Sequence, residues 1–206
     1  MKDVRIAAIV EGHGECEAVP ELIRRIARDI EPGFVPTVLS PLRVPASRLL
    51  KSGEIERSMD LAARKLRGRG GIVVIVDCDW DGGCPARDGP ALLQRARQAH
   101  MDYPICVVLA KKEYEAWFLA AAESLRGRRR LPDDLVGPPD PESISGAKEW
   151  LSDKMPRGIS YSETDDQPAL TAVFDMTAAR QCADSFDKCY RDLYGMLHAL
   201  RKAIDA

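Results

Sequence analysis

Apolar residues fall along the chain in short unbroken runs that alternate with stretches of helical spacing. The run Ile6–Val10 stops at the sequence EGHGE, and apolar side chains then recur at intervals of three and four residues as far as Ile30. Such intervals place the apolar side chains on one face of a helix. The beginning of the chain is therefore predicted to form a strand, a glycine-rich turn and a helix.

The same alternation continues toward the middle of the chain. It predicts an edge strand at 37–42, a helix at 55–66, a strand at 72–76, a helix at 90–100, a strand at 105–110 and a helix at 114–122. The unbroken apolar run Ile72–Val76 is typical of a central parallel strand that helices cover on both faces. The order predicts an α/β fold with a parallel sheet, in which ligands lie beyond the carboxyl ends of the strands.

The last third of the chain has a different character. Residues 126–145 are rich in Arg, Pro, Gly and Asp, which indicates a long surface loop, and helices are expected at 147–154 and at about 185–204. A chain of 206 residues has room for one core but hardly for a second full domain. We expect an α/β core at 1–125 and, at 126–206, a loop and a helical C-terminal extension that packs on the same core.

The composition of the chain limits the kinds of binding partner that we expect. Lys and Arg total 30 against 32 Asp and Glu, so nucleic-acid contact must depend on local patches rather than on a global positive field. The first apolar run is too short for a signal peptide or a membrane span, which predicts a cytoplasmic protein without a membrane partner. The six cysteines show no CxxC pair, and reduced packing thiols are the favoured interpretation.

Acidic residues follow two of the predicted central strands. Glu11 follows the first strand, and Asp77 and Asp79 follow the strand at 72–76. Since parallel strands point their carboxyl ends to one edge, these carboxylates are expected to converge, and Mg²⁺ prefers such oxygen ligands. The alternative is that they are solvated loop residues or helix caps, which is the favoured interpretation for Glu11 alone but not for the set.

Two of these motifs carry a resemblance to a known fold. Glu11-Gly12 and Asp77-Cys78-Asp79 resemble the Toprim pattern of a Glu after the first strand and an Asp-x-Asp after a later one. More narrowly, the segments VEGHGE, VDCDWDG, KKEYEAWFLA and ETDDQPALTAVFD look like a bacterial domain of unknown function (DUF4276-like) that is grouped with Toprim proteins.

The resemblance implies a Toprim-like (Rossmann-like) fold and an activity. The activity is that of a metal-dependent nuclease or a related phosphoryl-transfer protein, as in overcoming-lysogenization-defect nucleases, and the setting it suggests is phage defence beside an ATPase. DNA is the more expected substrate, RNA the less expected, and a homo-oligomer is a further expectation. The alternative is a non-catalytic metal- or nucleic-acid-binding subunit of an ATPase-containing defence complex.

The resemblance also assigns roles to residues. Glu11 would act as a catalytic or metal-associated carboxylate, and Asp77 and Asp79 would bind Mg²⁺ or Mn²⁺. Glu15 is a second candidate catalytic acid, although a charge at a helix start is an equal alternative. Asp81 is a further candidate ligand.

Other charged residues offer additional candidates. Glu115 follows the strand at 105–110 and is a candidate extra acid, and Lys111 and Lys112 beside it are candidate phosphate-binding groups. Arg128 and Arg129 belong to a basic run that could contact a nucleic-acid backbone, although a solvated loop is an equal alternative.

Two competing motifs fit less well. The sequence DCDWDG opens like a calcium loop, but Asp88 stands at the twelfth position instead of Glu, and a predicted strand precedes the motif where an EF-hand requires a helix. The chain contains neither GxGxxG nor GxxxxGK[ST]. Any ATP hydrolysis is therefore expected to belong to a partner protein.

Overall fold

A parallel sheet of five strands forms the centre of the computed structural model, which describes residues 3–205. Three strands make up most of it, namely β1 (Arg5–Val10), β4 (Gly71–Cys78) and β5 (Ile105–Lys111). The order is β2-β1-β4-β5, and β3 also pairs with β1. All of these pairings are parallel, so the α/β parallel-sheet fold predicted from the sequence is confirmed.

The central strand β4 is apolar because both of its faces are covered. Val74 pairs with Ile9 on one side and with Val107 on the other. Val73 and Ile75 belong to one hydrophobic core, whereas Ile72 and Val74 belong to the core on the opposite face. Alternate side chains of one strand therefore fill two cores, which explains the unbroken apolar run.

The edge of the sheet beside β1 is interrupted. The expected strand at 37–42 is split into β2 (Thr37–Val38) and β3 (Leu42–Arg43), each of which pairs with β1. Pro41 lies between them and has no N–H group to donate to the ladder. A proline at this point explains why a single edge strand does not form.

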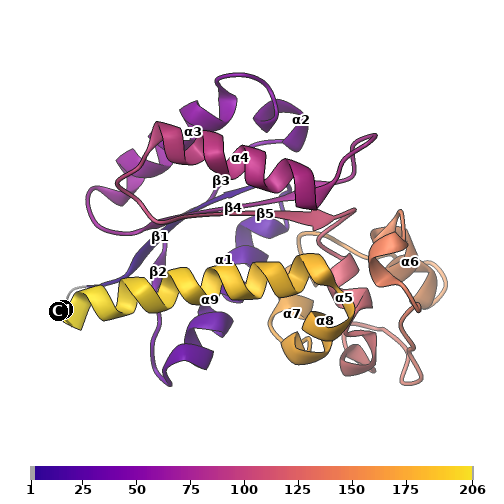
Figure 1. Cartoon of the computed structure of the whole chain (residues 1–206). Helices are drawn as coiled ribbons and strands as arrows, with labels where there is room; N and C mark the ends of the chain where they lie inside the picture. Colours follow the sequence, from indigo (N-terminus) through magenta and orange to yellow (C-terminus); the bar gives the residue numbers. More distant parts are fainter. Residues whose placement is uncertain (1–2, 206) are drawn as a thin grey trace.

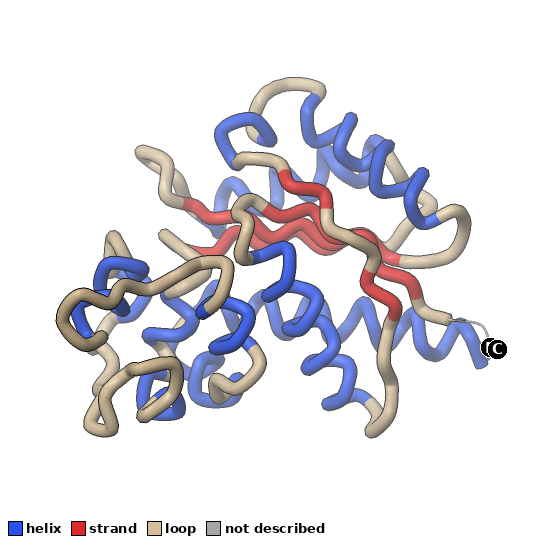
Figure 2. The backbone as a smooth tube through the Cα atoms, turned by 180° about the vertical axis from the view of Figure 1, so that it is seen from behind, coloured by secondary structure: helices blue, strands red, loops and turns tan. Residues whose placement is uncertain are grey.

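Helices cover the sheet in two layers, as Figures 1 and 2 show from opposite sides. One face carries α1 (Glu15–Ile30) and α9 (Asp184–Asp205), and the other carries α2 (Ala46–Leu49), α3 (Glu54–Leu66) and α4 (Pro85–Ala99). The chain leaves β1 toward the edge on one face and returns to β4 on the other. Strand order therefore reverses between β1 and β4, and open α/β sheets bind ligands at such a point.

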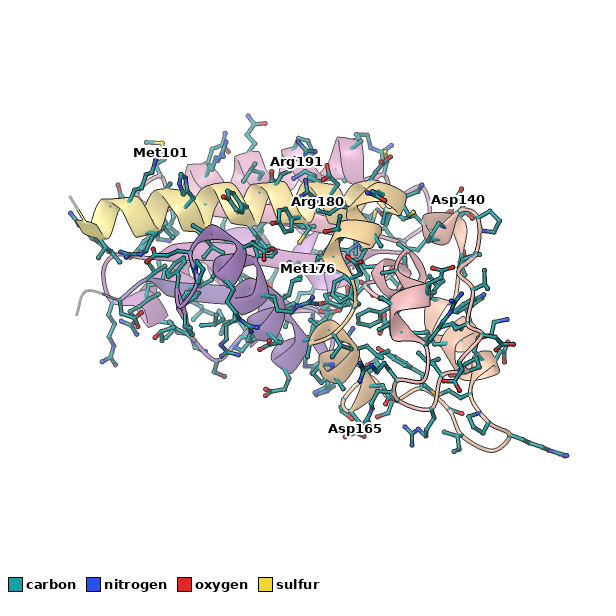
Figure 3. All side chains as sticks on the ribbon, turned by 90° about the horizontal axis from the view of Figure 1, so that it is seen from below. Met101, Asp140, Asp165, Met176, Arg180 and Arg191 are labelled. Carbon is teal, nitrogen blue, oxygen red and sulfur yellow. The ribbon has the colours of Figure 1, made fainter. Side chains whose placement is uncertain are left out.

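Short helices gather beyond the carboxyl ends of the strands (Figure 1). They are α5 (Ala116–Leu119), the 3₁₀ turns η1 (Ala122–Leu125) and η2 (Pro141–Ser143), α6 (Ala147–Lys154), α7 (Asp166–Thr171) and α8 (Met176–Cys182). Figure 3 shows Asp140 and Asp165 at this end of the molecule and Met101 at the other. Trp117 packs against Phe186 of α9 with ring centroids 5.2 Å apart, as expected of a packing residue.

Some element boundaries differ from those expected. Strand β4 continues through Asp77 and Cys78, which pair with Ala110 and Lys111, instead of stopping before Asp77. Helix α4 begins at Pro85, not at Pro90, and α7 and α8 were not anticipated. Within residues 3–205 no helix combines the length and the apolar character that a membrane crossing requires.

Candidate functional site

An acidic cavity lies at the carboxyl edge of the sheet, between β1 and β4. Its volume is about 210 Å³, and its lining residues are Glu11, Gly12, Glu15, Asp77, Asp79, Lys148, Glu163 and Gln167. Four of these, Glu11, Glu15, Asp77 and Asp79, are acids that the sequence had made candidates. The other wall comes from residues after position 145, which the sequence analysis did not connect with the site.

Glu11 stands where β1 ends. Its Oε1 atom accepts a hydrogen bond from the backbone N–H of Ala46 at 3.0 Å, whereas its buried Oε2 atom has no partner among the described residues. Burial, together with the charge of Asp79, raises the pKa of Glu11, although the bond from Ala46 opposes this shift. One oxygen of the carboxylate is therefore fixed by the fold, and the other is free to bind a ligand.

Glu15 shapes the turn after β1. Its Oε2 atom accepts hydrogen bonds from the backbone N–H groups of Glu11 at 2.7 Å and Gly12 at 3.0 Å. Burial raises the pKa of Glu15, and these two backbone bonds oppose the shift. One oxygen of Glu15 thus holds the turn that presents Glu11, which is a structural task.

Asp77 and Asp79 come from β4 and the residues after it. Asp77 is buried, and its Oδ1 atom accepts a hydrogen bond from the backbone N–H of Tyr114 at 2.8 Å. Burial and the charges of Glu15 and Glu115 raise the pKa of Asp77 well above its ordinary value. Asp79 is exposed, and Asp81 is exposed in the next turn and does not line the cavity.

Lys148 brings the positive charge of the cavity. Its Nζ atom lies 3.2 Å from Glu163 Oε1, 3.6 Å from Glu115 Oε2 and 3.8 Å from Asp77 Oδ2. Burial alone would lower the pKa of Lys148, but the charges of Glu115 and Asp77 outweigh it and raise this pKa. The ammonium is therefore held in its charged form. No motif around Lys148 indicated this role, because the contacts join distant segments.

Glu115 lies behind Lys148 and is fully buried. Its Oε1 atom accepts hydrogen bonds from Tyr161 Oη at 2.9 Å and from Gln167 Nε2 at 3.0 Å. Its buried Oε2 atom has no hydrogen-bond partner in the described part of the chain. Burial raises the pKa of Glu115 to about 7, so this carboxyl group changes its charge near neutral pH.

Gly14 allows the two walls of the cavity to meet. A Cβ atom at this position would lie 2.2 Å from the carbonyl oxygen of Glu163 and 2.4 Å from Gln167 Oε1. Both distances are far shorter than van der Waals contact, so no larger residue fits here without a shift of the backbone. The segments VEGHGE and ETDDQPALTAVFD, which stand far apart in the sequence, therefore touch in the fold.

The four candidate phosphate-binding residues lie outside the cavity lining. Lys111, at the exposed end of β5, lines a different cavity together with Lys188, and Lys112 has a left-handed backbone with φ of 69°. Arg128 is exposed. Arg129 donates from Nε to the buried Asp166 at 2.7 Å, so its charge holds the loop after η1 against α7.

The donor types in the cavity fit a hard divalent cation. Carboxylate oxygens are the ligands that Mg²⁺ prefers, and the Oε2 atoms of Glu11 and Glu115 are buried without a hydrogen bond among the described residues. As the side chains stand, no three acidic, His or Cys groups within residues 3–205 are arranged to hold a metal ion. The types of donor atom in the cavity therefore suit a divalent cation, whereas the present positions of the described side chains do not form a coordination shell.

Comparison with known proteins identifies the family. A family model described as a domain of unknown function (DUF4276) matches residues 10–193, a range that includes both walls of the acidic cavity. No curated protein matches the chain significantly. No solved structure does so either. Because the family model covers most of the chain, the protein belongs to the DUF4276 family.

Proposed function

We propose that this protein is a metal-dependent nuclease, or a related phosphoryl-transfer protein, with a Toprim-like active site. The observation that supports this best is the meeting of Glu11, Asp77 and Asp79 in one cavity, from the ends of two adjacent parallel strands. The cavity also lies at the point where strand order reverses, which is where such sheets bind ligands.

Glu11, Asp77 and Asp79 are the residues that would hold Mg²⁺ or Mn²⁺. Two observations support metal binding by these residues. The Oε2 atom of Glu11 has no hydrogen bond among the described residues, and the several carboxylates that line the cavity face a single ammonium group, that of Lys148. A bound divalent ion supplies polarisation of a phosphodiester oxygen and a more acidic water molecule.

The remaining residues bind and position. Lys148 presents an ammonium group at the cavity, and such a group donates hydrogen bonds to phosphate oxygens. Glu115 holds Lys148 from behind, and Tyr161 and Gln167 hold Glu115 in turn. Glu15 acts on the turn that carries Glu11 and is therefore a positioning residue.

The wider context is part of the same proposal. The Toprim relationship, the preference for DNA over RNA, the association with an ATPase partner and the role in phage defence rest on the resemblance of the EG and DCD motifs. The acids of the cavity support this chemistry, since a divalent cation held by carboxylates can promote hydrolysis of a phosphodiester at neutral pH.

Metal binding and cutting test the proposal on the same samples. Titration calorimetry with Mn²⁺ and Mg²⁺ and cleavage of supercoiled plasmid are measured for the wild type, Asp77→Asn and Asp81→Asn. In Asp77→Asn the amide oxygen of the new side chain can still accept the bond from Tyr114, so the fold should persist, while one metal ligand loses its charge. Binding and cutting should disappear in Asp77→Asn and persist in Asp81→Asn. Equal cutting by Asp77→Asn and the wild type would exclude the proposal.

One observation favours a second function, a metal- or nucleic-acid-binding subunit that does not turn over alone. Lys148 already contacts three carboxylates, so the cavity is partly neutralised without an added ion. In this case the wild type would bind Mn²⁺ but cut plasmid only after an ATPase partner is added. Full cutting by the isolated chain would exclude this alternative.

A further inference from the structure

A second charged depression lies between α3 and the edge of the sheet beside β1 and β3, and we call it the basic groove. It has a volume of about 490 Å³ and is lined by Arg5, Leu42, Leu61, Arg64, Lys65 and Arg67. Four of these six residues are cationic and none is acidic. They come from β1, from β3 and from the last turns of α3 and its C-terminal cap, on the face of the sheet opposite α9 (Figure 1).

Two of the four cations of the groove are held in place by backbone carbonyl groups, which leaves their charge unneutralised. Arg5 donates from Nη1 to the carbonyl oxygen of Leu66 at 2.7 Å, and Lys65 donates from Nζ to the carbonyl oxygen of Ser40 at 2.6 Å. In the part of the chain that the structure describes, none of the four cations forms an ion pair, whereas Arg57, earlier in α3, lies 3.7 Å from Glu54. The groove therefore offers its positive charge to an outside ligand.

Arg67 occupies a backbone position that suits glycine better. It caps α3 with a left-handed conformation, φ 50°, in which a side chain is crowded against its own backbone. The next residue is Gly68, so the chain has a glycine within one position of the cap. An arginine at this position does not favour the fold. Its place in the groove lining therefore indicates that its side chain binds a ligand.

The groove runs along the edge of the sheet beside β1, since Arg5 lies at the start of that strand whereas Leu42 pairs with Ile9 near its end. Arg5 begins β1, and Glu11 follows its last residue. At about 3.3 Å per residue, the strand separates Arg5, the far end of the groove, from Glu11 of the cavity by roughly 20 Å. With about 3.4 Å per base pair, this distance corresponds to about six base pairs of a duplex.

We infer that the basic groove binds the phosphodiester backbone of a duplex nucleic acid, over a stretch that reaches, at Arg5, about six base pairs from the bond that lies at the acidic cavity. This inference rests on the proposed function and adds the substrate's length and strand state to it. The groove contacts phosphates only, so it contributes affinity without sequence preference.

Binding in EDTA tests the inference apart from any cutting. Fluorescence anisotropy with a labelled 20-base-pair DNA duplex is measured over a series of KCl concentrations for the wild type and Arg64→Ala/Arg67→Gly. Lys202→Ala, an exposed cation on α9 over the opposite face, is the control. Each lost phosphate contact lowers the slope of log K against log salt by about 0.9, so the double variant should lose roughly two units of slope and the control none.

Thermal unfolding guards against a folding artefact. Glycine suits the left-handed cap, so Arg67→Gly alone should unfold at the same temperature as the wild type or higher and still bind the duplex more weakly. Equal salt slopes in all variants, or no binding by the wild type in EDTA, would overturn the inference. Hydrolysis of bis(p-nitrophenyl) phosphate with Mn²⁺ by the wild type reports on the acidic cavity alone, since this substrate is too short to reach the groove.

Discussion

The ammonium group of Lys148 lies 3.6 Å from Oε2 of Glu115, a buried carboxylate oxygen that has no hydrogen bond within the described residues. Glu115 stands at the start of α5, and Lys148 stands in the first turn of α6. The long segment between these helices therefore has an ion pair between its two ends. This contact ties the helices beyond the sheet to the strand ends that carry the acids.

Removal of the ammonium should destabilise the protein most at alkaline pH. In Lys148→Met the carboxylates of Asp77 and Glu115 lose their counter-charge. The free energy of unfolding should fall by about 2 kcal/mol at pH 8, which is less than for a fully buried ion pair because Lys148 is partly exposed. At pH 5 the loss should be smaller, since both acids have raised pKa values and bind protons instead. Urea unfolding at the two pH values measures the difference.

The control for this experiment is Lys154→Met in the same helix, which loses an exposed cation–π contact with Trp150 but touches none of the cavity acids in the described structure. Its stability should change little at either pH. An equal loss for Lys148→Met at pH 5 and pH 8 would contradict the electrostatic explanation.

Glu115 should make stability fall as pH rises. Its pKa is about 7 in the folded protein against an ordinary value of 4.5, so between these values the folded state holds a proton that the unfolded state releases. Stability therefore declines across this window, by at most about 1.4 kcal/mol per pH unit for one proton. Glu115→Gln should flatten the decline. Urea unfolding in EDTA from pH 4 to pH 8 measures it, and parallel curves for the two proteins would refute this assignment.

Gly14 should tolerate no side chain. In Gly14→Ala the added methyl group would collide with the backbone of Glu163, and we expect a loss of about 2–3 kcal/mol together with faster proteolysis around residues 160–167. Gly12→Ala is the matched control, since its nearest neighbour, Glu15 Oε1, would lie 3.7 Å from the methyl group. If both variants unfold at the same urea concentration, the close approach of the two segments is not the reason for the glycine.

Arg128 and Arg129 should differ although they are adjacent and exposed. Arg129→Ala leaves the buried Asp166 with the longer contact to Arg130 at 3.3 Å as its ion pair and with the hydrogen bond from the backbone N–H of Ser162, and the expected loss of stability is about 1–2 kcal/mol. Arg128→Ala should stay within about 0.5 kcal/mol of the wild type, as surface substitutions usually do. Thermal unfolding of both variants decides this, and similar losses would mean that the Arg129–Asp166 pair is not structural.

The sheet could be predicted from the sequence because its strands are encoded locally. The apolar runs that contain Ile9, Val74 and Val107 each identify a buried strand without reference to any other part of the chain. Helix α4 begins earlier than its sequence pattern predicts, because Pro85 and not Pro90 occupies its first turn. Both prolines lie within α4, and a proline at either position is compatible with the first turn of a helix.

One wall of the site could be predicted and the other could not. Glu11 and Asp77 terminate apolar strands, and parallel strand order alone brings them to one edge. Lys148, Glu163 and Gln167 reach the cavity through the packing of α6 and α7, which depends on contacts over distances of more than fifty residues in the sequence. Glu163 and Gln167 lie in the segment ETDDQPALTAVFD, to which no chemistry could be assigned, and Lys148 lies in no motif.

The two-walled cavity has a consequence for the timing of synthesis. A ribosome has delivered every strand of the sheet once Lys111 has been added, yet Lys148 and Gln167 are still unmade. Until those residues emerge, the acids of β1 and β4 lack the wall that Gln167 forms and the ammonium group of Lys148. The cavity is therefore complete only after these residues of the final third of the polypeptide have left the exit tunnel.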